Sequence, residues 1–313
     1  MRSRKLLLTM ATGVAVVSSS IMVSSPAMAL NIFVCEPEWQ ALIHSHAPEA
    51  NIYSATTAMQ DPHYVQARPS LIAKMRQADM AMCSGSELEV GWLPMLQVRS
   101  GNPVVQDSEP TMLYASDMVG MLDTHDHVDR SMGDIHAHGN PHVQFAAEYM
   151  IPISREVTKR LQLIDPDNST VYMRNGMKFR ANWRKKLAEW ETKAEPLQGK
   201  KVVGYHATYR YLFDWLDMTQ IADLEPKPGI SPTTAHLQTL TKLDPASFDA
   251  IVYSSHQDKR PANWLNQQTG KPMVQLPLSV SEGQSLDEMY DQVIDELLEL
   301  LDLLVDSETP KSS

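Results

Sequence analysis

The sequence predicts an α/β protein that consists of two lobes with parallel sheets. Short apolar strands alternate with helical patterns, which is typical of βαβ units. A polar stretch and a long helix interrupt this alternation once, after which it starts again. The chain has 313 residues, 43% of them hydrophobic. Single cores seldom grow past about 250 residues, so this length favours two domains.

The first series of elements covers residues 31–105, where apolar runs predict strands and helical periodicity between them predicts helices. Pro69 stands at a helix start, where proline is favoured, and Ser84-Gly85-Ser86 predicts a turn. We expect strands at Asn31–Cys35, Asn51–Ala55, Asp79–Cys83 and Pro103–Val105, and helices at Trp39–His46, Pro69–Gln77 and Leu88–Gln97. These four strands with their crossovers make one lobe.

The middle of the chain has a different pattern. Residues 107–140 are rich in Asp, Glu and His and lack apolar periodicity, so they predict a long polar loop. A helix is expected over Phe145–Leu163. Ser169 looks like the N-cap of a second helix that runs to about Glu195. Its apolar face and its Lys/Arg face would suit a rigid connector between the lobes.

The second series of elements begins at Lys200 and resembles the first in kind. We expect strands at Lys201–Tyr205, Ala250–Ser254 and Met273–Leu278, and helices at Thr208–Leu216, Thr233–Leu243, Pro261–Thr269 and Leu286–Leu303. The predicted organisation is therefore an N-terminal lobe over residues 30–168, a linker helix over residues 169–195 and a C-terminal lobe over residues 196–313.

The first 29 residues have the pattern of a secretory signal peptide. Arg2, Arg4 and Lys5 precede an apolar run that is too short to span a bilayer, and Ala27-Met28-Ala29 is a cleavage signal. We expect cleavage after Ala29 and export to the periplasm. The net charge of -11 and the lack of a basic stripe argue against nucleic acid as a partner.

The chain has two cysteines, Cys35 and Cys83, each at the end of an apolar run that predicts a buried strand. Two cysteines are too few for a disulfide scaffold. In an oxidising compartment they could pair if their strands are neighbours. Two buried free thiols are the alternative, and the sequence leaves both open.

Three of the eleven histidines stand near the ends of predicted strands or the starts of helices. His63 follows Asp61-Pro62, His142 follows Gly139-Asn140-Pro141, and His206 directly follows the strand that begins at Lys201. In parallel α/β sheets, ligands bind outside the carboxyl ends of strands, so the three side chains could meet between the lobes. Three imidazoles favour a borderline-soft divalent ion, with Zn²⁺ first.

At these residues the sequence resembles the solute-binding proteins of metal ABC importers, specifically their zinc branch. The similarity runs in order through almost the whole chain after the signal peptide. It is carried by Asp61-Pro62-His63 with Arg68-Pro69-Ser70, by Cys83 to Glu89 with Trp92-Leu93, by Gly139-Asn140-Pro141-His142, by Tyr172, Asn175 and Phe179, and by Tyr205-His206 with Tyr209-x-Tyr211-Leu212.

This resemblance implies two lobes, each with a four-stranded parallel sheet flanked by helices. One long linker helix would join them, and the metal would lie in the cleft. It carries His63, His142 and His206 over as metal ligands. A histidine at the third position is expected for zinc, whereas manganese-binding members tend to have Glu there, because Mn²⁺ prefers oxygen donors.

The sequence departs from the family pattern at the fourth ligand. Many relatives have an Asp after the last strand, where this chain reads Gln275-Leu276-Pro277-Leu278. Zinc takes four ligands, so we expect the fourth to be water, a nearby acid such as Glu282 or Asp287, or a loop histidine. His138 is the preferred loop candidate, because it lies close to His142 in sequence.

The segment 107–138 has the place and composition of the family's loop that is rich in His and acidic residues. The resemblance implies that this loop captures metal weakly and passes it inward, with transient ligands at His125, His127, His136 and His138. A solvated acidic loop without this role is the alternative.

The resulting hypothesis is a monomeric, non-enzymatic periplasmic protein that binds Zn²⁺ and delivers it to an ABC transporter permease. A periplasmic zinc chaperone is a second candidate partner. Two alternatives stay open. A secreted zinc hydrolase would need a carboxylate general base at the metal, and Asp61 alone lies near a predicted ligand in sequence. A zinc chaperone or metal-linked adhesin would use the same site.

Overall fold

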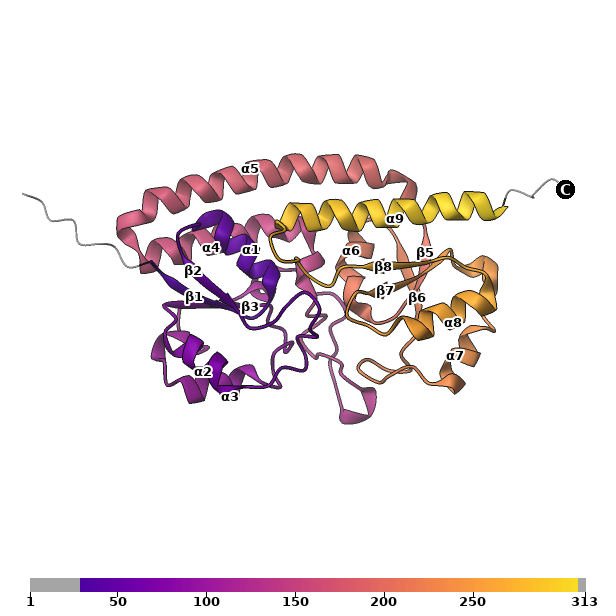
Figure 1. Cartoon of the computed structure of the whole chain (residues 1–313), viewed down its shortest axis with the longest axis horizontal. Coiled ribbons are helices and arrows are strands. Elements are labelled where there is room, and N and C mark those ends of the chain that lie inside the picture. The colour runs from indigo at the N-terminus through magenta and orange to yellow at the C-terminus, as the bar shows by residue number, and fades with distance from the viewer. Residues whose placement is uncertain (1–28, 309–313) are drawn as a thin grey trace, which may run out of the picture.

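The computed structural model describes residues 29–308 and shows two lobes side by side (Figure 1). Each lobe contains one parallel sheet of four strands, as expected. The first sheet has the order β2-β1-β3-β4, with β1 at Asn31–Val34, β2 at Asn51–Ser54, β3 at Met80–Cys83 and β4 at Met112–Tyr114. The second has the order β6-β5-β7-β8, with β5 at Lys201–Gly204, β6 at Thr219–Asp223, β7 at Ala250–Ser254 and β8 at Met273–Leu276.

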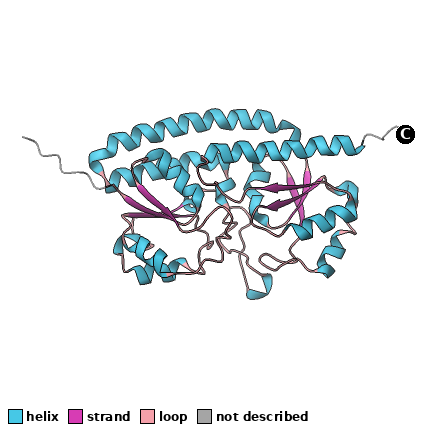
Figure 2. Cartoon of the chain, viewed as in Figure 1, coloured by secondary structure: helices cyan, strands magenta, loops and turns pink. Residues whose placement is uncertain are grey.

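Helices cover both faces of each sheet (Figure 2). The N-terminal sheet is flanked by α1 (Pro37–His46), α2 (Pro69–Arg76), α3 (Leu93–Ser100) and α4 (Met150–Ile164). The C-terminal sheet is flanked by α6 (Arg210–Trp215), α7 (Thr234–Leu240), α8 (Lys259–Thr269) and α9 (Leu286–Glu308). The outer faces bury two smaller apolar clusters, one under α2 and α3 and the other under α7 and α8.

The long helix α5 (Ser169–Ala194) runs across both lobes along their upper edge in Figure 1, and α9 packs beside it. Trp183 and Trp190 of α5 are buried against Tyr290 of α9, with ring centroids 5.3 and 5.1 Å apart. One continuous apolar cluster includes side chains of both sheets, α4, α5 and α9. The two lobes therefore share a core, and separating them as rigid bodies would expose apolar surface to water.

The fourth strand of the first sheet is not where the sequence indicated. Pro103–Val105 forms a 3-10 turn, because the Asn102 side chain accepts a hydrogen bond from the Val104 N–H and starts the turn. The edge strand is β4 instead, which pairs with β3 through Met112 and Leu113. The prediction of a strand at 103–105 is wrong, and the long polar loop predicted over residues 107–140 contains the strand β4.

Three further elements differ from expectation in the rest of the chain. The helix expected from Leu88 begins at Leu93. The helix expected from Phe145 begins at Met150, because the preceding residues form two short 3-10 turns around Phe145, whose ring packs on Tyr209 at 4.8 Å. Strand β6 was not expected. It is a half-buried edge strand, so its residues lack the apolar run that marks a central strand.

The predicted signal peptide lies almost wholly outside the described residues. The proposed division at residues 168/169 and 195/196 stays a prediction. Over residues 29–308, none of the helices combines the length and the apolar character that a membrane span needs.

Candidate metal centre

His63 stands in the loop that follows β2, at a turn made by Asp61 and Pro62. The Asp61 carboxylate accepts hydrogen bonds from the backbone N–H of His63 (3.0 Å) and from its ring Nδ1 (2.8 Å). The buried Trp92 indole donates to the Pro62 carbonyl at 2.9 Å. The turn therefore fixes both the backbone and the ring of His63.

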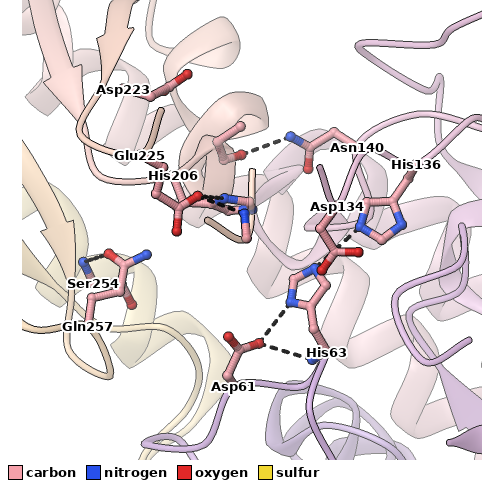
Figure 3. Close-up of polar contacts among 12 residues, drawn as sticks. Asp61, His63, Asp134, His136, Asn140, His206, Asp223, Glu225, Ser254 and Gln257 are labelled. Carbon is pink, nitrogen blue, oxygen red and sulfur yellow. Dashed lines mark hydrogen bonds and ion pairs between the residues drawn. The ribbon is translucent and has the colours of Figure 1, made fainter. Parts of the chain in front are cut away.

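His142 stands where the chain leaves the polar loop for α4. The Asn140 side chain accepts from the His142 N–H (3.0 Å) and donates to the Ala207 carbonyl (2.8 Å), next to His206. Asn140 thus connects the loop of one candidate ligand to the loop of another in the opposite lobe (Figure 3). His142 itself is buried, with 2% of its surface exposed.

His206 stands directly after β5, at the carboxyl end of a central strand of the second sheet. Its Nδ1 lies 2.9 Å from Glu225 Oε2, and Glu225 follows the edge strand β6. The same Glu225 oxygen accepts from the Gly229 N–H at 3.0 Å. The carboxyl ends of β5 and β6 therefore supply a histidine together with the carboxylate that orients it.

The fold brings these three histidines together between the lobes. Their ring nitrogens lie within 4.8 Å of one another, and their ring centroids are 5.4 to 5.9 Å apart. They border a cavity of about 250 Å³ whose walls come from both lobes. Figure 3 shows His63 beside Asp61, and His206 beside Glu225. The proximity that the strand-end positions suggested is therefore present in the structure.

The hydrogen bonds of the cluster orient its rings for binding a cation. A carboxylate only accepts hydrogen bonds, so Nδ1 of His63 and of His206 carries the proton and each Nε2 keeps its lone pair. Both ring nitrogens of His142 are buried without a hydrogen-bond partner among the described residues. A buried polar atom without a partner is costly, and a metal ion would satisfy it. The donor set therefore fits a divalent metal.

Protonation acts differently on His142 and His206. Burial lowers the pKa of His142 well below its ordinary value, and the neighbouring imidazoles lower it further, so this ring stays neutral. Burial also acts to lower the pKa of His206, but the hydrogen bond and the charge of Glu225 outweigh it, and the net shift is upward. Of these two rings, His206 is therefore the one at which protons compete with a metal as the pH falls.

The other predicted fourth ligands lie elsewhere in the structure. The His138 side chain is 77% exposed, lies 3.6 Å from the Glu87 carboxylate and borders a separate cavity of about 520 Å³. Asp287 borders a different surface hollow, between α1, α5 and α9, and Glu282 is exposed. Leu278 borders the histidine cavity, so an apolar side chain lines it after the last strand.

Four further residues lie at the site, of which the sequence indicated only His136, as a transient loop ligand, and Asp61, as the acid near His63. His136, two positions before His138, is buried with its Nε2 3.3 Å from His63 Nε2. His256 borders the cavity 3.9 Å from Asp61. Asp61 and Glu225 hold ligand rings. Asp61, Glu225 and His256 each follow a strand of one of the two sheets, and this position could have indicated them. A single sequence does not distinguish His136 from His138.

A second group of donor atoms lies in the first lobe and consists of Cys35, Cys83 and Glu89. Its two sulfur atoms are joined in a disulfide, with the Cα atoms 4.8 Å apart. The disulfide is possible because β1 and β3 are neighbours in the sheet. This decides between the two alternatives that the sequence left open, and it removes the sulfurs as metal ligands.

We expect a Glu225→Gln variant to bind metal with a different pH dependence. Metal binding needs a neutral His206, and the raised pKa of this ring makes wild-type affinity begin to fall at a higher pH than it would with an ordinary imidazole. Without the negative charge the pKa of His206 falls, so the loss of affinity should begin at lower pH. Loss of the partner should also weaken binding at pH 8 by about 10-fold.

The measurement is the zinc dissociation constant from pH 5.5 to 8.5, with Glu282→Gln as the control because Glu282 is exposed. If the wild-type and Glu225→Gln curves have the same shape, Glu225 does not control the protonation of His206.

Three comparisons with known proteins agree on the class of this chain. A family model described as "Zinc-uptake complex component A periplasmic" matches residues 39–302. The high-affinity zinc uptake system protein ZnuA of Yersinia pestis is 24% identical over 214 residues, 64% of this chain and 67% of that protein. The manganese ABC transporter substrate-binding lipoprotein PsaA of Streptococcus pneumoniae is 23% identical over 255 residues, 77% of this chain and 78% of that protein. A crystal structure of ZnuA, 18% identical, superposes with a TM-score of 0.73 over 87% of this chain and 99% of that one, a likeness of fold.

Proposed function

Because this chain belongs to the family of the zinc-uptake complex component A, the metal-binding receptors of ABC importers, we propose that its cargo is Zn²⁺. It captures the ion between its lobes through His63, His142 and His206 and delivers it to the importer's permease. Members of the family work with a permease and an ATPase. The proposal concerns the identity of the metal and the residues that hold it.

The observation that carries the choice of zinc is the donor set. Among the described residues, the group whose donor atoms lie within 4.8 Å of one another at this site consists of three imidazoles and contains no carboxylate. The nearest carboxylates, Asp61 and Glu225, are hydrogen-bonded to Nδ1 of two of the rings. Imidazole suits Zn²⁺, whereas Mn²⁺ prefers carboxylate, carbonyl and water oxygens. Relatives include proteins named for each metal, so the donor set is the stronger guide.

The same hydrogen bonds disfavour a hydrolase. A hydrolytic zinc site needs a carboxylate free to take a proton from the metal-bound water. Asp61 instead holds the His63 ring and backbone, and the charge and hydrogen bonds of His63 keep the Asp61 pKa below its ordinary value despite its burial. A chaperone or adhesin role would use the same three histidines, and family membership favours the import receptor.

The setting of this function is part of the proposal. The pattern of residues 1–29 supports export to the periplasm and cleavage after Ala29. We expect a monomer that hands its metal to the permease, and that can be loaded by a periplasmic zinc chaperone.

The test is a competition titration of the metal-stripped protein with Zn²⁺ and Mn²⁺. We expect one tight zinc site and at least about 100-fold weaker manganese binding, because the Irving–Williams order and the donor type act in the same direction. A strain that lacks the gene should stop growing in chelated medium and recover with zinc but not with manganese. Equal affinities, or recovery with manganese alone, would exclude zinc as the cargo.

A further inference from the structure

The polar loop contains a flap, defined here as residues 126–136, with a firmly held root. At the root, the His125 N–H donates to the Ala137 carbonyl (3.1 Å) and the Asn140 N–H to the Leu122 carbonyl (2.8 Å). The Tyr211 hydroxyl of the C-terminal lobe donates to the Asn140 carbonyl at 2.8 Å. On the N-terminal side, the Glu87 carboxylate accepts from the Ala137 N–H at 3.0 Å. Both lobes therefore hold the root.

The tip of the flap docks on the opposite lobe, against residues 227–230. The Asp134 N–H donates to the Pro228 carbonyl at 2.8 Å, and the Lys227 ammonium donates to the Ser131 carbonyl. The backbones come so close that a Cβ on Gly133 would lie 2.5 Å from Pro228 O, and one on Gly229 would lie 2.8 Å from Asp134 Cβ. Both glycines have positive φ, at +89° and +75°. The docked position therefore depends on glycine on both sides.

The flap carries His136 to the metal centre. Its Nε2 lies 3.3 Å from His63 Nε2 (Figure 3), close to the separation of about 3.4 Å for two nitrogen ligands of one tetrahedral zinc. The His136 ring is buried, with 9% of its surface exposed. Leu278 borders the cavity and offers no donor atom. His136 is thus the loop histidine placed to complete the site.

We propose that His136 is the fourth metal ligand and that docking of the flap on residues 227–230 holds it there, so that undocking starts metal release. This inference rests on the proposed function. The docking loop also touches the other side of the site, because Gly229 donates to the carboxylate that orients His206. Docking therefore acts on ligands of both lobes at once.

Undocking of the flap needs less free energy than separation of the two lobes, so it is the favoured way to release the metal. The lobes share a continuous buried core along α5 and α9, and opening them would expose it to water. The tip is held by a few polar contacts that are largely exposed, and exposed polar contacts contribute little. Local opening of such a segment needs little free energy.

The test compares Gly229→Ala with Gly199→Ala. Both positions have a φ of +75°, but a Cβ at Gly199 meets nothing within 4 Å, so the control has the same backbone strain without the clash. We expect Gly229→Ala to release zinc into excess chelator at least about 10-fold faster than wild type, with Gly199→Ala within about two-fold of it. Lys227→Ala removes one tip contact from an exposed segment and should accelerate release in the same direction.

His136→Ala tests the ligand itself, and His138→Ala is its matched control in the same loop. We expect about 100-fold weaker zinc binding for His136→Ala and wild-type binding for His138→Ala. In the cobalt-loaded protein, His136→Ala should change the visible spectrum, because water replaces a nitrogen ligand. Trypsin cleavage after Arg130 should be slow in zinc-loaded wild type and fast in Gly229→Ala.

The outcomes separate the two proposals. If wild type binds zinc tightly and His206→Ala does not, while His136→Ala binds as wild type does, the inference about His136 is wrong and the proposed function stands. If Gly229→Ala and Lys227→Ala both keep wild-type release and cleavage rates, docking does not control release. If wild type itself binds no zinc tightly, the proposed function fails first.

Discussion

We expect the His206→Ala variant to lose zinc affinity by about 100- to 1000-fold. Structural zinc sites bind with about 10–16 kcal/mol, so one ligand of four accounts for about 2.5–4 kcal/mol. His206 is the strongest choice because the C-terminal lobe supplies it, whereas His63 and His142 precede the linker helix α5. Its loss leaves Glu225 without its hydrogen-bond partner, and the remaining ligands all come from the part of the chain that precedes α5.

The measurement is competition calorimetry on the metal-stripped protein, with His44→Ala as the control because His44 is exposed on α1. Thermal unfolding without metal should be similar for the two variants, which would separate ligand loss from misfolding. Wild-type affinity in His206→Ala would refute the three-histidine site. A loop-deletion variant for the same assay should remove only residues 126–135, because deletion of the whole segment 107–138 would also remove β4.

The second large effect is expected on stability, when the disulfide between Cys35 and Cys83 is removed. Removing it in a Cys35→Ala/Cys83→Ala variant should lower the free energy of unfolding by about 4 kcal/mol, because the bridge closes a loop with a sequence separation of 48 residues and so restricts the unfolded chain. Zinc affinity should change little, since neither cysteine touches the histidine cluster.

Urea unfolding followed by tryptophan fluorescence measures this effect, and Trp39 reports on the region because its indole donates to Ser84 beside Cys83. Wild type unfolded with a dithiol reductant should match the double variant. If oxidised wild type and the double variant unfold at the same urea concentration, the bridge contributes nothing to stability.

Much of the fold could be predicted from the sequence, because central strands carry their own signal. β1, β3, β5 and β7 lie inside their sheets and are almost wholly buried, so they appear as short apolar runs between helical patterns. Among the edge strands, β2 and β8 were also predicted, whereas β4 was misplaced and β6 was missed. β4 has only three residues and lies in a polar segment, and β6 is half-buried without an apolar run, so neither has the pattern of a buried strand.

The candidate site, like the fold, has residues that could be predicted from the sequence and one that could not. His63, His142 and His206 could be selected because each stands at a strand end or a rigid turn, a property of a few neighbouring residues. His136 could not be separated from His138, because both lie in one short polar segment. One ring is buried against His63 and the other is exposed, and the docking of the flap on a loop about 90 residues further along the chain makes that difference.

The sequence by itself determined the α/β class, the two lobes, the three histidines and the family, since these depend on local pattern and residue chemistry. Only the tertiary structure decided that Cys35 and Cys83 are bonded, that Asp61 and Glu225 orient two of the rings, and that His136 lies at the centre. Each of these contacts joins residues whose distance in space depends on strand order and loop packing. No local pattern in a single sequence encodes that distance.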